Sequence, residues 1–152
     1  MTQAIHNIKL TRTSLLNIID GLTVEQLNKI PEGFNNNIIW NVAHLISAQQ
    51  GICYVRAGLK YPVEEHIFKA YAVGTKPEAF VDDIEIAKIK ELLLSTLDIL
   101  AADFDQNIFF GYQEWTTRYG VTLSNIDEAL KFLIFHEGLH FGYIMALKRV
   151  IA

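Results

Sequence analysis

The chain has 152 residues, of which 51% are hydrophobic, and a formal net charge of −4 at pH 7; this suits a single domain, residues 1–152, with one core. Its Lys and Arg residues are scattered, and its uncharged apolar runs are far shorter than the ~20 residues of a membrane span, so we expect neither a nucleic-acid nor a membrane partner. A single cysteine, Cys53, excludes an internal disulfide, and the N-terminus lacks the pattern of a signal peptide, which together indicate a cytoplasmic protein.

The first half of the chain predicts two long helices and one short helix. Apolar residues recur at helical spacing from about residue 2 to 20, where Asp20-Gly21 ends the segment. Thr23 begins a short helix that Pro31 ends. A further helix is expected over residues 38–57, preceded by three asparagines that can cap it. Residues 59–81 then predict a long connection with room for one helical turn.

The second half predicts two more long helices. Asp82-Asp83 can cap a helix that continues to about residue 104, and residues 105–121 predict a second crossover with extended or hairpin character. The pattern Ser124-x-x-Asp127 begins a last helix that runs to the end of the chain. Four long helices with long connections predict an all-α fold, a four-helix bundle. The core of such a bundle can house metal sites built from facing helices.

The last helix carries the sequence H-E-G-L-H at residues 136–140. Histidines four residues apart lie on one helix face, with ~6 Å between their Cβ atoms, so His136 and His140 can bind one divalent ion. The stretch also matches the zinc-protease signature, in which the glutamate is the general base. Those proteases take a third ligand downstream, but residues 141–152 contain no His, Cys, Asp or Glu. The third ligand must therefore come from upstream, and a metalloprotease is the least favoured interpretation.

His44, in the middle of the second long helix, is the candidate third ligand. Ser47, Ala48 and Gly51 share its helix face and leave a hollow beside the imidazole, and aromatic residues between 112 and 119 could cover that hollow. Three neutral imidazoles with one open position are typical of a catalytic site, because structural zinc usually has four protein ligands. Taken alone, His44 would more often be a hydrogen-bonded core or boundary histidine, whereas metal binding is preferred over a structural role for the pair His136 and His140.

Several neighbouring residues have more than one interpretation. Glu137 could orient metal-bound water, hold a histidine in place, or face solvent, and a solvated or salt-bridged role is slightly preferred. Gly138 and Gly142 form a smooth groove, for which close packing of a neighbouring helix is preferred over a partner subunit or a ligand. His6 and His66 have no partner at metal spacing and are expected at the surface.

Two segments together resemble the DinB-like superfamily: residues 37–45, with Trp40-x-x-x-His44, and residues 136–142, with His-x-x-x-His. The resemblance covers essentially the whole chain. It implies an up-down-down-up four-helix bundle, frequent homodimers, and a three-histidine site for a divalent metal, most often zinc or nickel. That site maps onto His44, His136 and His140. Characterised members of the superfamily include bacillithiol and mycothiol S-transferases and a mycothiol-dependent maleylpyruvate isomerase, while many members have no known activity.

The residues and the resemblance together predict a metal-dependent enzyme. The metal would lower the pKa of a thiol or a water molecule, which would then attack a small electrophilic substrate. A low-molecular-weight thiol is the expected second substrate, and Glu137 is the candidate base or supporting residue. The alternative is a protein that binds a metal or a small ligand without turnover.

Overall fold

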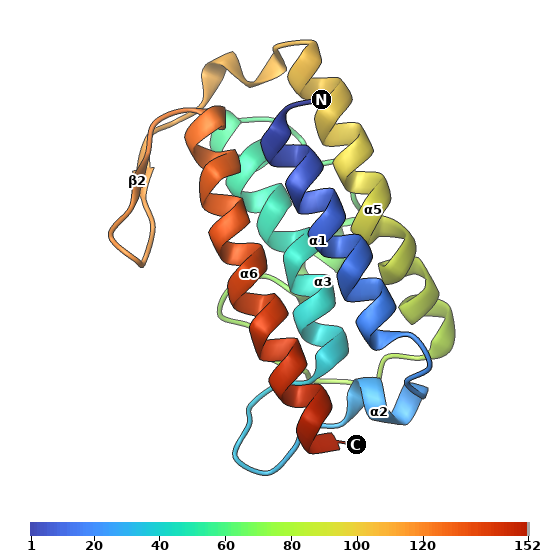
Figure 1. The fold of residues 1–152 in the computed structure, drawn as a ribbon. Coiled ribbons are helices and arrows are strands. Elements are labelled where there is room, and N and C mark those ends of the chain that lie inside the picture. Colours follow the sequence, from blue (N-terminus) through green and yellow to red (C-terminus); the bar gives the residue numbers. More distant parts are fainter. Residues whose placement is uncertain (152) are drawn as a thin grey trace.

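Four long helices lie side by side in the computed structural model, which describes residues 1–151 (Figure 1). Their bounds are Gln3–Ile19 for α1, Ile38–Gln49 for α3, Asp83–Asp105 for α5 and Ile126–Ile151 for α6. Two short helices, α2 (Val24–Asn28) and α4 (Glu65–Ala70), lie in the connections. Along the long axis of the molecule, α1 and α6 run in one direction and α3 and α5 in the other (Figure 1). The prediction of an all-α fold is confirmed.

The helices begin where the sequence predicted their caps. Thr23 forms a complete capping box with Gln26 at the start of α2. The side chain of Asn37 accepts a hydrogen bond from a backbone amide in the first turn of α3, and Asp82 does the same for α5. These caps pair amides that would otherwise lack a partner, so they fix where each helix starts.

The last helix differs slightly from the prediction. The side chain of Asn125, rather than that of Ser124, accepts the hydrogen bond from the backbone amide of Glu128, at 3.0 Å. The Ser124 amide instead donates to the Glu128 carboxylate at 2.7 Å. The cap therefore lies one residue later than expected. Ala152, which the prediction included in this helix, lies outside the described residues.

The second long helix loses its regular geometry after Gln49. It continues as a π-helical segment, η1 (Gln50–Tyr54), and a 3-10 turn, η2 (Val55–Ala57). Gly58 then ends it with a φ of +69°, a left-handed conformation that favours glycine. Segments of π-helix occur often at functional sites, and this one adjoins the cavity described below.

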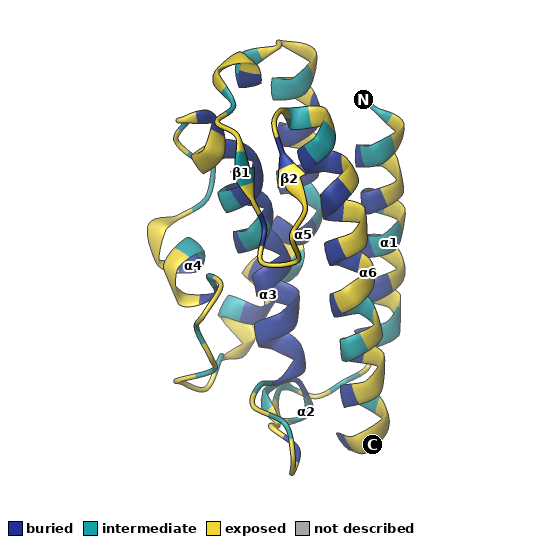
Figure 2. Ribbon diagram, turned by 90° about the vertical axis from the view of Figure 1, so that its left-hand side faces the viewer, coloured by how far each residue is buried: buried dark blue, intermediate teal, exposed yellow. Residues whose placement is uncertain are grey.

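The crossover between α5 and α6 contains a 3-10 turn, η3 (Ile108–Gly111), and the predicted hairpin. Its strands, β1 (Trp115–Thr116) and β2 (Thr122–Leu123), pair antiparallel. Figure 2 shows the hairpin on one side of the molecule, alongside α3 and α6.

The core is built around α3, in which every residue except Ala48 is buried (Figure 2). Apolar side chains form two clusters along the molecule, one toward α2 and one toward the hairpin. On α1, the buried Arg12 lies between Ile8 of one cluster and Leu15 of the other. Polar side chains therefore occupy the middle of the core. None of the described helices is long and apolar enough to cross a membrane.

Candidate metal centre

The three histidines predicted as ligands meet between α3 and α6. His44 comes from α3, His136 and His140 come from α6, and one ring nitrogen of each lies within 4.8 Å of the others. The ring centroids are 4.5 to 5.2 Å apart, and all three side chains are buried. Trp40 stacks on His44 at 4.8 Å and closes one side of the group. This buried cluster could hold a divalent metal ion.

Hydrogen bonds fix the orientation of two of the rings. His44 Nδ1 lies 2.7 Å from the carbonyl oxygen of Tyr71, which can only accept, so Nδ1 carries the proton. His140 Nδ1 lies 2.9 Å from Asn41 Oδ1. The amide nitrogen of Asn41 donates to the Asn37 carbonyl, which identifies Oδ1 as the acceptor for His140. In the neutral forms of both rings, Nε2 therefore has a free lone pair, as metal-binding histidines require.

The third ring is incompletely paired. Nδ1 of His136 is buried and has no hydrogen-bond partner among the described residues. A buried nitrogen without a partner is costly, so such an atom needs a reason. Two oriented imidazoles and a third with an unpaired nitrogen fit a divalent ion that favours nitrogen ligands.

The environment keeps all three imidazoles neutral. Burial lowers the pKa of His136 to about 2 and that of His140 to about 3, and the neighbouring histidines and Arg118 add to both shifts. Burial also lowers the pKa of His44, although its hydrogen bond to Tyr71 opposes the shift. Metal ions bind neutral imidazole, so these histidines are ready for a ligand role without releasing protons.

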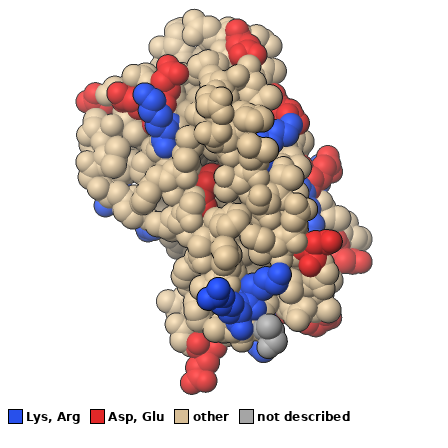
Figure 3. Space-filling model, in the orientation of Figure 1, with Lys and Arg blue, Asp and Glu red and all other residues tan. Residues whose placement is uncertain are grey.

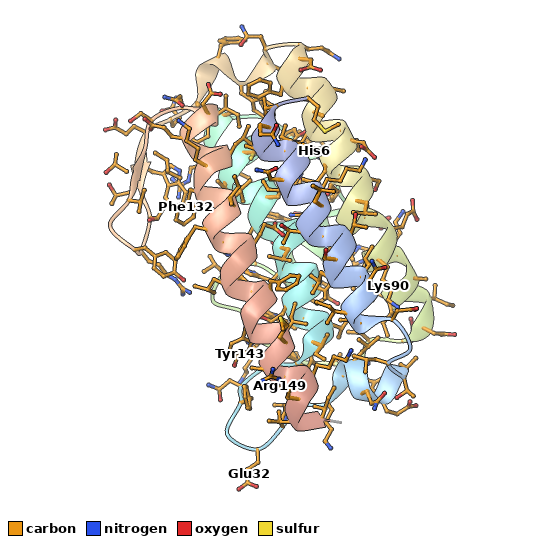
Figure 4. All side chains as sticks on the ribbon, viewed as in Figure 1. His6, Glu32, Lys90, Phe132, Tyr143 and Arg149 are labelled. Atoms are coloured by element: carbon orange, nitrogen blue, oxygen red, sulfur yellow. The ribbon has the colours of Figure 1, made fainter. Side chains whose placement is uncertain are left out.

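A cavity of about 340 Å³ lies beside the cluster, with His44 and His136 in its wall. Ser47, Ala48 and Gly51 line it, as their small size on the face of His44 predicted. Residues of the hairpin form part of its wall. Phe132, labelled in Figure 4, lies on the side of α6 that faces the hairpin. The remaining lining residues come from η1 and η2, from the α4 region, from the hairpin and from α6: Ile52, Val55, Arg56, Phe68, Ala72, Val73, Trp115, Thr117, Arg118, Tyr119 and Phe132.

Glu137 lies away from this cavity, in a buried ion pair with Arg12. The shortest contact joins Arg12 Nη2 to Glu137 Oε1 at 2.7 Å, and Arg12 Nε lies 3.1 and 3.2 Å from the two carboxylate oxygens. Arg12 also donates to Gln49 Oε1 and to the carbonyl oxygens of Leu45 and Leu93. Burial raises the pKa of Glu137, and the Arg12 guanidinium opposes that rise. The salt bridge is therefore observed, whereas the expectation of a solvent-facing Glu137 is wrong, because this side chain is buried.

Other sequence predictions have mixed outcomes. His6 and His66 are exposed, as expected. Cys53 is buried and free, and burial raises the pKa of its thiol to about 12, so it is not a nucleophile at neutral pH. The preferred interpretation of Gly138 and Gly142 is wrong. A Cβ atom added at either position would meet nothing within 4 Å, so none of the other described helices packs closely against them.

Three groups around the cluster were not predicted from the sequence. Asn41 was detectable in principle, because it precedes His44 by three residues and so shares its helix face. The partner of His44 is a backbone carbonyl of Tyr71, which no residue type can signal. Arg118 reaches the cavity from a hairpin whose path the sequence does not specify.

A family model described as the DinB superfamily matches residues 7–144 of the chain. The matched region includes the whole cluster of His44, His136 and His140. No curated protein matches the chain.

Proposed function

Since the chain belongs to the DinB superfamily, we propose that His44, His136 and His140 hold a divalent metal ion, zinc or nickel, in the active site of a metal-dependent transferase. One observation carries the proposal: three neutral imidazoles converge within 4.8 Å beside a cavity of about 340 Å³. Three protein ligands leave a coordination position for a substrate, which closed structural sites lack. The up-down-down-up four-helix bundle of the family is part of the same proposal.

When bound, a divalent ion lowers the pKa of a thiol or a water molecule. The chain supplies orientation and exclusion of water. Tyr71 and Asn41 hold the rings of His44 and His140, while Phe132 and the hairpin cover the cavity. The sulfur of a low-molecular-weight thiol would form a bond to a small electrophile. The thiol proton would go to solvent, and the leaving group would depart with its electron pair.

Glu137 does not act as a base in this proposal. Its carboxylate is bound by Arg12 and is not part of the cavity wall. Its role would instead be to hold α6, which carries two of the three ligands, against α1.

A second candidate function is binding of a metal and a small ligand without turnover, in a sensor or a store. One observation favours it: none of the described residues that line the cavity is Asp, Glu or Lys. The cavity therefore contains no carboxylate or amine that could serve as a general base.

The test is to load the protein with zinc, nickel or manganese and to supply low-molecular-weight thiols with a chlorinated aromatic electrophile. We expect turnover with at least one ion, lost in His44→Ala and kept in the control His66→Ala, because His66 is exposed and outside the cluster. Unfolding in urea measures binding separately, since an ion at 100 times its Kd raises the free energy of unfolding by ~2.7 kcal/mol. Stabilisation without turnover would favour the second function, and no stabilisation by any ion would contradict both.

We also propose a homodimer formed through the exposed face of α6. Phe135, Leu139 and Met145 are 50%, 37% and 40% exposed on this helix, which is unusual for large apolar side chains. Gly138 and Gly142 have open space around them and would let an identical helix approach closely. Figure 3 shows few charges in the middle of the face that carries α1 and α6, and a cluster of Lys and Arg atoms lower down. An apolar surface of this kind is self-complementary, as a two-fold interface requires.

Light scattering after size exclusion tests the dimer. Leu139→Glu places a charge in the middle of the apolar face and should give a monomer. Lys90→Glu is the control, because Lys90 lies on α5 (Figure 4). A dimer that persists in Leu139→Glu would contradict this interface.

Two broader predictions remain proposals. We propose a cytoplasmic location, because the one cysteine is a free, buried thiol, which suits a reducing compartment. We also propose that the chain forms one domain, because α6 packs against both α1 and α3.

A further inference from the structure

Two positively charged side chains, both exposed, line the cavity beside the histidine cluster. Arg56, from η2, and Arg118, from the hairpin, line it, and none of the described lining residues is Asp or Glu. The chain as a whole has a net charge of −4, so this local excess of positive charge does not follow from composition.

Neither arginine forms an ion pair with a carboxylate in the part of the chain that the structure describes; the arginine that does so there is Arg12. The guanidinium of Arg56 lies 4.0 Å above the ring of Trp115. Arg118 Nη2 donates to Tyr119 Oη at 3.0 Å. Stacking on Trp115 positions the Arg56 guanidinium without using its in-plane N–H donors, whereas Arg118 uses one N–H donor for Tyr119 and keeps the others. Both groups therefore remain able to bind an anion.

Arg118 and the histidine cluster share one space. Arg118, His44 and His136 all line the same cavity. A ligand that brings a negative group to Arg118 would therefore lie in the same space as the histidines, rather than at a separate surface site.

The rest of the cavity is apolar and small. Phe68, Trp115 and Phe132 supply aromatic walls, and Ala48 and Gly51 leave space between them. A volume of about 340 Å³ is near the lower end of the range of ~300–1,000 Å³ for small-molecule sites. It suits one ring with a short side chain.

We propose that this cavity selects a small aromatic carboxylate, whose carboxylate group binds Arg118 and Arg56 and whose ring packs between Trp115 and Phe132. A guanidinium matches the planar geometry of a carboxylate and can donate two parallel hydrogen bonds to it. The inference rests on the proposed function in one respect, that this cavity is the substrate site, and it names the class of the electrophilic substrate.

The test compares cinnamate with its neutral isostere cinnamamide by isothermal titration calorimetry, on metal-free and on zinc-loaded protein. We expect cinnamate to bind about 10-fold to 100-fold more tightly in both forms, because hydrogen bonds to a charged group are the stronger ones. Arg118→Gln should remove most of this preference. The matched control Arg149→Gln should keep it, because Arg149 lies near the end of α6, outside the cavity (Figure 4).

Zinc affinity, measured in parallel by competition with a chelating dye, separates this inference from the proposed function. Arg118→Gln should bind zinc like the wild type, because Arg118 is not one of the three ligands. A preference for cinnamate in a protein that binds no metal would contradict the metal proposal alone. Equal affinity for acid and amide, no binding of either, or an unchanged preference in Arg118→Gln would overturn the inference.

Discussion

His136 and Glu137 are adjacent in sequence, yet they belong to two buried polar clusters of opposite character. His136 joins His44 and His140 in a neutral cluster that borders a cavity and leaves one nitrogen unpaired. Glu137 joins Arg12 in a charged cluster whose guanidinium donates to acceptors on every side. Successive residues of a helix point ~100° apart, so one turn of α6 serves both. A buried polar group with all its partners is structural, whereas an unpaired one beside a cavity indicates a ligand.

The arginine cluster also explains how the histidine cluster keeps its geometry. Arg12, on α1, bonds to Glu137 on α6, to Leu45 and Gln49 on α3, and to Leu93 on α5. A single guanidinium therefore connects all four long helices. Because the histidines come from α3 and α6, fixing these two helices to each other also fixes the distances between the ligands.

The largest expected effect comes from removing one partner of the ion pair. Glu137→Ala leaves the charge of Arg12 buried without a counter-ion. This should lower the free energy of unfolding by about 3–5 kcal/mol. Urea unfolding of metal-free protein measures the loss. The control Glu91→Ala should change the free energy of unfolding by less than about 0.5 kcal/mol, because Glu91 is exposed and lies 3.7 Å from Lys88.

A double variant separates the cost of the unpaired charge from the contribution of the pair itself. Arg12→Met with Glu137→Leu fills the same space without charge, and such replacements of buried ion pairs are often neutral or stabilising. We expect it to recover most of the stability lost in Glu137→Ala. A loss below about 1 kcal/mol in the single variant would show that Arg12 and Glu137 do not have the structural role assigned to them.

The second-largest expected effect is a decrease in stability at acidic pH. The folded-state pKa values of His136 and His140, about 2 and about 3, lie below the ordinary value of 6.5. Below pH 6.5 these imidazoles are protonated in the unfolded chain but remain neutral in the folded protein. The free energy of unfolding therefore falls as the pH falls. Between pH 7 and pH 5 each imidazole should contribute a loss of about 2 kcal/mol. Burial of His44 acts in the same direction.

Urea unfolding of metal-free protein between pH 7 and pH 5 measures this slope. In His136→Asn the loss over the same interval should be smaller by about 2 kcal/mol, since all other titrating groups are shared with the wild type. An unchanged slope in His136→Asn would mean that this imidazole takes up its proton in the folded protein.

The two clusters were not equally predictable from sequence. The histidine pair follows from helical spacing, and the hollow beside His44 follows from the small residues on its face, because both are properties of a single helix. The helix caps at Thr23 and Asn37 were predictable for the same reason. The arginine cluster depends on residues 125 positions apart.

Arg12 did leave a partial signal in the sequence. It occupies a position within the apolar stripe of α1, four residues after Ile8 and three before Leu15. That position predicts burial, and a buried arginine requires acidic partners. It does not identify the partner. The direction of Glu137 was undetermined for the same reason: the angle between adjacent side chains follows from helical geometry, but which of them faces the core depends on how the helices assemble.

The smallest expected effect concerns zinc affinity, and it tests whether the orientation of the His140 ring matters for metal binding. Asn41 Oδ1 accepts a hydrogen bond from His140 Nδ1, which leaves Nε2 of His140 free to bind a metal. Loss of such a supporting group lowers metal affinity about 10-fold to 100-fold. Asn41→Ala should therefore bind zinc more weakly by this factor, as measured by competition with a chelating dye. Asn41→Asp keeps an acceptor and should bind at least as tightly as the wild type.

The matched control for this prediction is Asn36→Ala, because Asn36 bonds to the amide nitrogen of Asn41 and belongs to the same network without a contact to His140. If Asn36→Ala weakened zinc binding as much as Asn41→Ala, the effect would come from the start of α3 and not from the orientation of the ring. A difference between the two variants would instead mean that two rings of the cluster are oriented by the protein for a metal ion. Nδ1 of His136 would then be the buried ring nitrogen that no described protein group orients.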